Sequence, residues 1–145
     1  MKIKLSLSAI AVAGILALMN FSGSSATMLE EELDGLTLIK GRLHQLDEPS
    51  VEGGLSITFS QILAESRCPA GVQCIWAGEV AVELVFEKSG AIYREKLVLP
   101  GAGDPKPREL HGYRVTLLEV YPFPELDAPE PAPEEIKIVI NLKKL

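Results

Sequence analysis

The chain has 145 residues, with 20 acidic and 14 basic side chains, and its formal net charge is −6 at pH 7. A negative surface repels the phosphates of nucleic acids and of anionic lipids, so the charge excludes both as electrostatically held partners. A chain of this length corresponds to one domain and is long enough to bury a core without additional cross-links.

Residues 1–26 have the layout of a secretory signal peptide. Two lysines precede an uncharged apolar run at 5–19, and small polar residues follow. Ser24 and Ala26 fit the small-residue rule for cleavage, whereas the apolar run is shorter than the roughly 20 residues of a spanning helix. An uncleaved anchor is the alternative. We therefore expect a signal peptide, one exported β domain at 27–145 that is free of the membrane after cleavage, and a periplasmic or secreted location.

The rest of the chain is rich in the apolar–polar alternation that is typical of strands with one buried face. Six such segments follow one another at about 36–38, 55–59, 79–87, 91–99, 113–121 and 136–143. Helical signals are confined to 28–33 and 59–65, where one or two turns would fit. Breaker-rich loops at 100–107 and 122–133 complete the pattern. It predicts an all-β fold, namely an antiparallel β-sandwich or small barrel of about six to eight strands.

Two of these segments carry signs of irregularity. Glu95 interrupts the apolar face of 91–99, and a bulge there would explain it. In 113–121 the apolar positions change parity at Leu117-Leu118, which indicates a bulge or a strand that is buried on both faces.

Cys68 and Cys74 are the only cysteines, and cysteines of an exported protein usually pair. Pro69 and Gly71 can bend the intervening chain back so that the bond forms. A metal site or two free thiols are the alternatives, but the C-x5-C spacing fits no common zinc pattern. We therefore expect a disulfide-closed loop and neither a metal nor a cofactor.

The elements Arg67-Cys68-Pro69 and Cys74-Ile75-Trp76-Ala77-Gly78 resemble a motif of small bacterial exported domains and lipoproteins of unknown function. In that family a D-S-R-C-P-x-x-V-x-C-x-W-A-G stretch precedes an alternating strand. The resemblance implies an exported β domain with a Cys68–Cys74 bond, and it supplies no catalytic residues. This chain departs from the motif at Glu65, where the family has Asp, and it lacks a lipid-attachment cysteine. The departure leaves open whether Glu65 caps the loop backbone.

Within the loop, Pro69, Val72, Gln73 and Trp76 are the candidate binding residues. The favoured interpretation of Trp76 is nevertheless structural, as a buried ring packed on the disulfide. The alternative is a partly exposed recognition aromatic, because tryptophan anchors interfaces well.

Three further residues are expected to support the loop. Arg67 is predicted to pair with a carboxylate such as Glu65 or Glu79, or to stack on Trp76, rather than to bind an anionic ligand. Gly71 and Gly78 are predicted to serve backbone conformations with positive φ or a close approach.

Catalysis has little support, because His44 and His111 show no triad or elbow spacing relative to a serine. The favoured hypothesis is a monomeric, non-enzymatic binding or structural module, whose partner is an unknown protein or small ligand. An inhibitor of an extracytoplasmic hydrolase that uses the Cys68–Cys74 loop as a wedge is the second. A hydrolase or metal carrier that uses both histidines is the third.

Overall fold

A computed structural model describes residues 32–46 and 54–145, which form eight β-strands and no helix. The signal peptide expected at 1–26 lies outside these ranges. The strands are β1 (Glu32–Ile39), β2 (Leu43–Gln45), β3 (Leu55–Glu65), β4 (Glu79–Lys88), β5 (Ala91–Pro100), β6 (Arg108–Leu110), β7 (Tyr113–Tyr121) and β8 (Lys137–Lys144).

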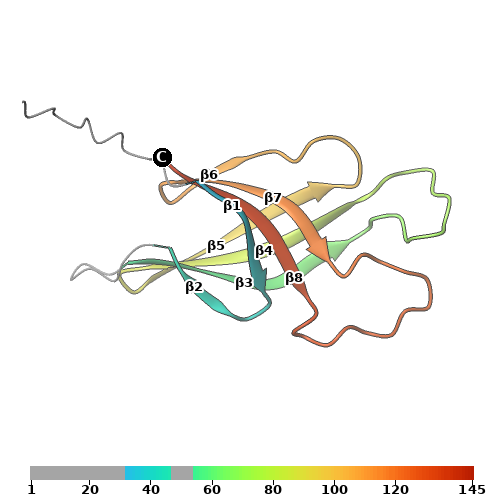
Figure 1. Cartoon of the computed structure of the whole chain (residues 1–145), viewed down its shortest axis with the longest axis horizontal. Coiled ribbons are helices and arrows are strands. Elements are labelled where there is room, and N and C mark those ends of the chain that lie inside the picture. The colour runs from blue at the N-terminus through green and yellow to red at the C-terminus, as the bar shows by residue number, and fades with distance from the viewer. Residues whose placement is uncertain (1–31, 47–53) are drawn as a thin grey trace, which may run out of the picture.

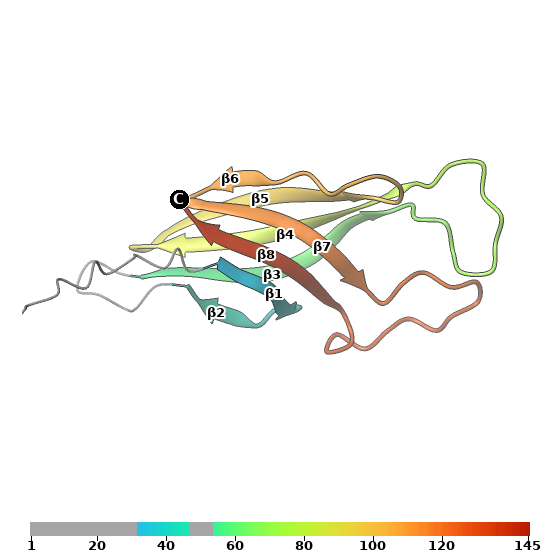
Figure 2. The ribbon, with the colours of Figure 1, turned by 45° about the horizontal axis from the view of Figure 1, so that its top comes forward.

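The strands form two antiparallel sheets of four, ordered β1-β8-β7-β6 and β2-β3-β4-β5. The sheets lie face to face as two layers, and neither closes on itself, so the fold is a sandwich rather than a barrel (Figures 1 and 2). The expected all-β class and strand number are thereby confirmed. The long, regular β5 lies at one edge of its sheet, and the short β6 lies at an edge of the other.

The core is built from the inward-facing positions of both sheets. On β4, Val80, Val82, Leu84 and Phe86 are all fully buried, as their alternation predicts. The largest buried side chains are aromatic, with Phe59 of β3 and Phe86 both at 0% exposure. Burying such a ring stabilises the fold by about 1.5–3 kcal/mol.

The expected helix at 59–65 is wrong, because this segment continues β3 and pairs with β4 up to Glu65. Two register irregularities, between Phe59 and Gln61 and between Ile62 and Ala64, explain the misleading pattern. A bulge adds one residue to the repeat of two, so the spacing from Phe59 to Ile62 imitates one turn of a helix. Of the other expected helix, only its last two residues are described, and they belong to β1.

The two expected bulges have opposite outcomes. The one in β7 is confirmed, with a register shift between Leu117 and Glu119. The one at Glu95 is wrong, because β4 and β5 pair without interruption and Glu95 lies opposite Leu84. Glu95 is tolerated on the inner side because polar partners meet it there, with His111 Nε2 at 3.2 Å and a nitrogen of the Arg108 guanidinium at 3.8 Å.

The connections gather at two ends of the sandwich. The tight turn at Ser89-Gly90 and the turn at His111-Gly112 lie at one end, and all four residues have positive φ. The disulfide loop 66–78 and the proline-rich loop 122–136 extend together from the opposite end (Figures 1 and 2). Within the described ranges, no helix is long and apolar enough to cross a bilayer.

Candidate functional site: the disulfide-clamped tip

The two loops at 66–78 and 122–136 form what is here called the tip. A parallel bridge between Ala70 and Glu125 joins them, and the Ala70 N–H donates to the carbonyl oxygen of Pro124 at 2.9 Å. Each loop therefore buttresses the other at the end of the sandwich.

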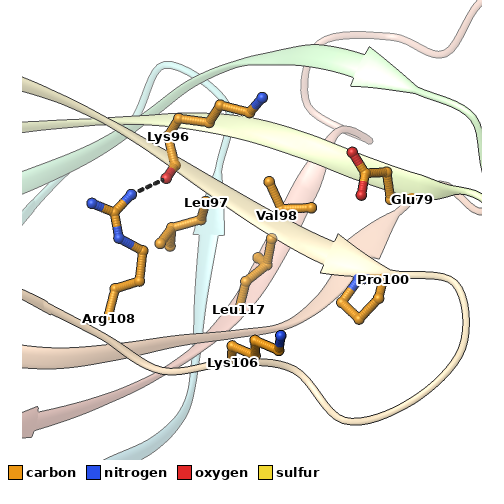
Figure 3. A pocket seen from close by; sticks show the side chains of 8 residues that line it. All are labelled: Glu79, Lys96, Leu97, Val98, Pro100, Lys106, Arg108 and Leu117. Atoms are coloured by element: carbon orange, nitrogen blue, oxygen red, sulfur yellow. Dashed lines mark hydrogen bonds between the residues drawn. The ribbon is translucent and has the colours of Figure 1, made fainter.

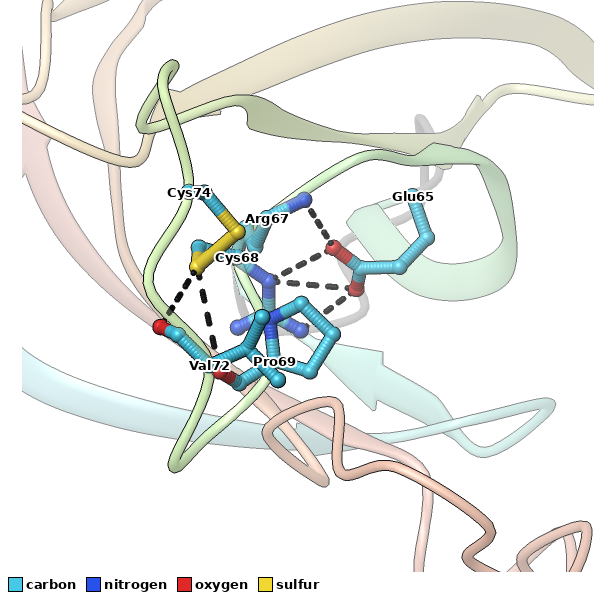
Figure 4. The surroundings of a disulfide bond; sticks show 6 residues. All are labelled: Glu65, Arg67, Cys68, Pro69, Val72 and Cys74. Carbon is cyan, nitrogen blue, oxygen red and sulfur yellow. Dashed lines mark hydrogen bonds and ion pairs between the residues drawn. A yellow bond between two sulfur atoms is a disulfide. The ribbon is translucent and has the colours of Figure 1, made fainter.

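The disulfide predicted from the sequence is present and closes the first loop. The Cα atoms of Cys68 and Cys74 are 5.9 Å apart, within the range that a disulfide spans (Figure 4). The carbonyl oxygen of Val72 lies 3.2 Å from Cys68 Sγ, but this is a close contact, since a bonded sulfur has no proton to donate. The bond fixes the path of residues 69–73 across the end of the molecule.

The base of the loop is held by backbone pairing that continues the β3–β4 ladder. The Ser66 N–H donates to the carbonyl of Glu79 at 2.8 Å, and the Ser66 hydroxyl accepts from the Glu79 N–H at 3.0 Å. Gly78 lies inside this closure with φ +70°, and a Cβ at that position would lie 1.8 Å from the Ser66 carbonyl oxygen. Gly71 also has positive φ, at +78°, but faces open space. Both expectations for these glycines are confirmed, and only Gly78 is sterically confined.

Arg67 is the buried support of the tip, with its side chain only 5% exposed. Its guanidinium pairs with both carboxylate oxygens of Glu65, the shortest contact being 2.5 Å (Figure 4). The Arg67 backbone N–H also donates to Glu65 Oε1 at 3.0 Å, so Glu65 caps the loop backbone despite being longer than the Asp of the motif. The fork geometry of arginine suits such a bidentate pair.

The same guanidinium reaches across to the second loop. It donates to the carbonyl oxygens of Val120 at 2.8 Å and Pro122 at 3.1 Å, and it lies 4.9 Å from the centre of the Phe123 ring. The expected pairing of Arg67 with Glu65 is therefore confirmed, whereas the aromatic ring beside the guanidinium is that of Phe123 and not that of Trp76. One arginine thus ties the disulfide loop to the start of the proline-rich loop.

Trp76 is 80% exposed, so its expected role as a buried ring packed on the disulfide is wrong. The physical reason is the direction of the loop. After Cys74 the chain runs over the outside of the molecule before it enters β4, and neighbouring Ile75 is 90% exposed. The geometry therefore favours the alternative interpretation of Trp76 as a recognition aromatic.

The tip concentrates exposed apolar side chains. Five of the eleven large apolar residues that are exposed in the described part of the chain lie on these two loops: Val72, Ile75, Trp76, Phe123 and Leu126. Of the predicted binding residues, Val72 and Gln73 are exposed, and Pro69 is partly buried at the base. Sequence reasoning missed the apolar residues of the second loop. The sequence indicated them only by the presence of large apolar residues among prolines and acids, because a loop that merely connects two strands is usually polar.

Charge on the tip is distributed unevenly. Residues 68–78 carry no charged side chain, whereas 122–136 carries five acids and no base. The acids are Glu125, Asp127, Glu130, Glu134 and Glu135. The tip therefore presents a neutral apolar surface beside a negatively charged strip.

The two histidines lie in different surroundings. His44 on β2 is paired opposite Ile57, and its Nε2 is buried without a hydrogen-bond partner among the described residues. His111 packs on Phe86 and Tyr93, with ring centres 5.0 and 4.4 Å apart. Within residues 32–46 and 54–145, no three His, Cys, Asp or Glu side chains are grouped so that they could hold a metal ion.

Comparison of the chain with protein-family models, with curated proteins and with solved structures finds no match. The structure itself describes the chain as an antiparallel β-sandwich whose apolar tip is closed by a disulfide. The resemblance of the loop motif to exported bacterial domains stays a prediction.

Proposed function

We propose that the protein is an exported, non-enzymatic binding module that engages a partner protein through the tip. One observation carries the proposal: Trp76 and Ile75, at 80% and 90% exposure, are displayed on a loop that a disulfide and the Arg67–Glu65 pair hold rigid. Exposed apolar clusters on soluble domains usually mark interaction sites.

The rigidity of the loop supports binding as well as stability. A loop that is already closed loses little conformational entropy when it docks, so more of the contact energy appears as affinity. Tryptophan is also the side chain most enriched among the residues that dominate interface energetics. A tryptophan displayed on a closed loop therefore suits a binding role.

The test is site-specific photo-crosslinking in the exported protein, with the crosslinker placed at Gln73. We expect one adduct that is lost in the Trp76→Ala protein and in the Cys68→Ala/Cys74→Ala protein. The matched control is Ile92→Ala, because Ile92 is 62% exposed at the opposite end of the sandwich, beside the Ser89-Gly90 turn. An adduct that survives Trp76→Ala, or that Ile92→Ala also abolishes, would contradict binding through the tip.

The inhibitor hypothesis is a second candidate, and one observation favours it. Val72 and Gln73 are exposed on a loop that projects from the end of the molecule, which is what a wedge for an enzyme cleft requires (Figure 2). If the crosslinked partner is a hydrolase, the wild-type protein should inhibit it stoichiometrically, and Trp76→Ala should not. A partner without hydrolase activity would remove this candidate and leave the binding module in place.

A further inference from the structure

A hollow lies next to the base of the tip, at the open side of the sandwich between the edge strands β5 and β6. It is a cleft of about 360 Å³ that shares no residue with the two tip loops (Figure 3). Its apolar lining consists of Leu97, Val98 and Pro100 of β5 together with Leu117 of β7. The smallest pockets that bind small molecules have about this volume. The cleft therefore suits a ligand with one short hydrocarbon chain rather than a lipid with two acyl chains.

The rim of the cleft carries positive charge on a protein that is otherwise acidic. Lys106 and Arg108 lie on the side formed by the β5–β6 connection and β6, and Lys96 lies on β5. Lys106 forms no ion pair with any described residue, and Arg108 has only a distant carboxylate at 3.8 Å. The one acid of the lining is Glu79, which Figure 3 places across the cleft from Arg108.

The backbone of β5 adds polar groups to the same cleft. Arg108 donates to the carbonyl oxygen of Lys96 at 2.7 Å, so the backbone N–H and C=O of Lys96 point away from β4. Because the β4–β5 ladder is regular, the backbone groups of successive residues point alternately toward β4 and away from it. The backbone N–H of Val98, two residues further on, therefore also points away from β4 and toward the cleft. The free edge of β5 therefore offers an N–H donor to the cleft.

We propose that this cleft binds a carboxylate that carries a single apolar chain. The carboxylate lies between Lys106 and Arg108, where two cations and the Val98 N–H can meet it, and the chain lies over Val98, Leu117 and Pro100. Charge complementarity selects this class, because the cationic groups are on the rim and the carboxylate of Glu79 would repel the head group from the opposite end.

The experiment uses decanoate below its micellar concentration as the probe, and it follows amide shifts of the ¹⁵N-labelled protein. We expect saturable shifts at the amides of residues 96–99, of Lys106 and of Arg108. Octanoate should bind about tenfold more weakly, because it lacks two methylenes. Lys106→Gln and Arg108→Gln should each weaken decanoate binding about fivefold.

The matched control is Arg94→Gln, which removes one positive charge from β5 outside the cleft, where Arg94 pairs with Glu83 at 2.9 Å. At 0.15 M salt, binding to this variant should equal that of the wild type, since the screening length is about 8 Å. The proposal fails if Arg94→Gln weakens binding as much as Lys106→Gln, or if decyltrimethylammonium binds as tightly as decanoate. It fails equally if the shifts fall on the tip around Trp76, or if no saturable shift appears.

Discussion

Replacing Arg67 by alanine should destabilise the protein far more than removal of an ordinary surface arginine. The side chain is 5% exposed and makes five short contacts, three to Glu65 and two to the backbone carbonyls of Val120 and Pro122. Its loss removes the guanidinium that donates to the buried carbonyl of Val120 and that pairs with Glu65.

The magnitude follows from the environment of each partner. Breaking a buried pair costs about 3–5 kcal/mol, but Glu65 is 31% exposed, so water can solvate its carboxylate after the change. The lost carbonyl contacts add about 1–3 kcal/mol for the buried acceptor. Together these effects give a loss of about 3 kcal/mol, which lowers the unfolding midpoint of a domain of this size by roughly 10 °C.

The assay is thermal unfolding followed by circular dichroism, with Arg94→Ala as the matched control. Arg94 also pairs with a glutamate, Glu83, at 2.9 Å, but its side chain is 62% exposed, so its removal should change stability by less than about 1 kcal/mol. The unfolding midpoint of Arg67→Lys should lie between those of Arg67→Ala and Arg94→Ala, because lysine keeps the positive charge but cannot form the bidentate contact of a guanidinium. Equal midpoints for Arg67→Ala and Arg94→Ala would refute the assignment of Arg67 as the support of the tip.

Three further predictions concern single positions. Gly78→Ala should lower the free energy of unfolding, measured by chemical denaturation, several times more than Gly71→Ala. A Cβ at position 71 meets no neighbouring atom, so Gly71→Ala should cost only about 1–2 kcal/mol for its positive φ. Equal losses for the two variants would contradict the steric argument. Trp76→Ala should leave the unfolding midpoint within about 2 °C of the wild type, since the ring is 80% exposed, and a large fall would restore its structural role. The pKa of Tyr121 is raised above its ordinary value of 10.0 by the hydrogen bond to Glu119 and by repulsion from the charge of Glu119. Glu119→Gln should therefore lower the pKa of Tyr121 in an ultraviolet titration. An unchanged titration midpoint would rule out this coupling.

The sequence alone determined the class of the fold and the closure of the loop. The alternation on β4 settles which side chains face the core, because a strand has a period of two and the opposite register would turn Glu83 and Glu87 inward. The lone pair of cysteines, six residues apart, was sufficient to predict the disulfide. Where bulges break the period, as between Phe59 and Ile62, the same reasoning gave a helix that does not exist.

Only the tertiary structure decided what surrounds the loop. The motif shows that Arg67 and Glu65 are close in sequence, but the carbonyls that complete the site come from Val120 and Pro122, more than fifty residues away. Exposure of Trp76 was equally unreadable, because a tryptophan beside a disulfide has the same sequence signature whether its ring turns inward or outward. Its direction is set by how the loop leaves the sheet, and that depends on contacts between distant segments.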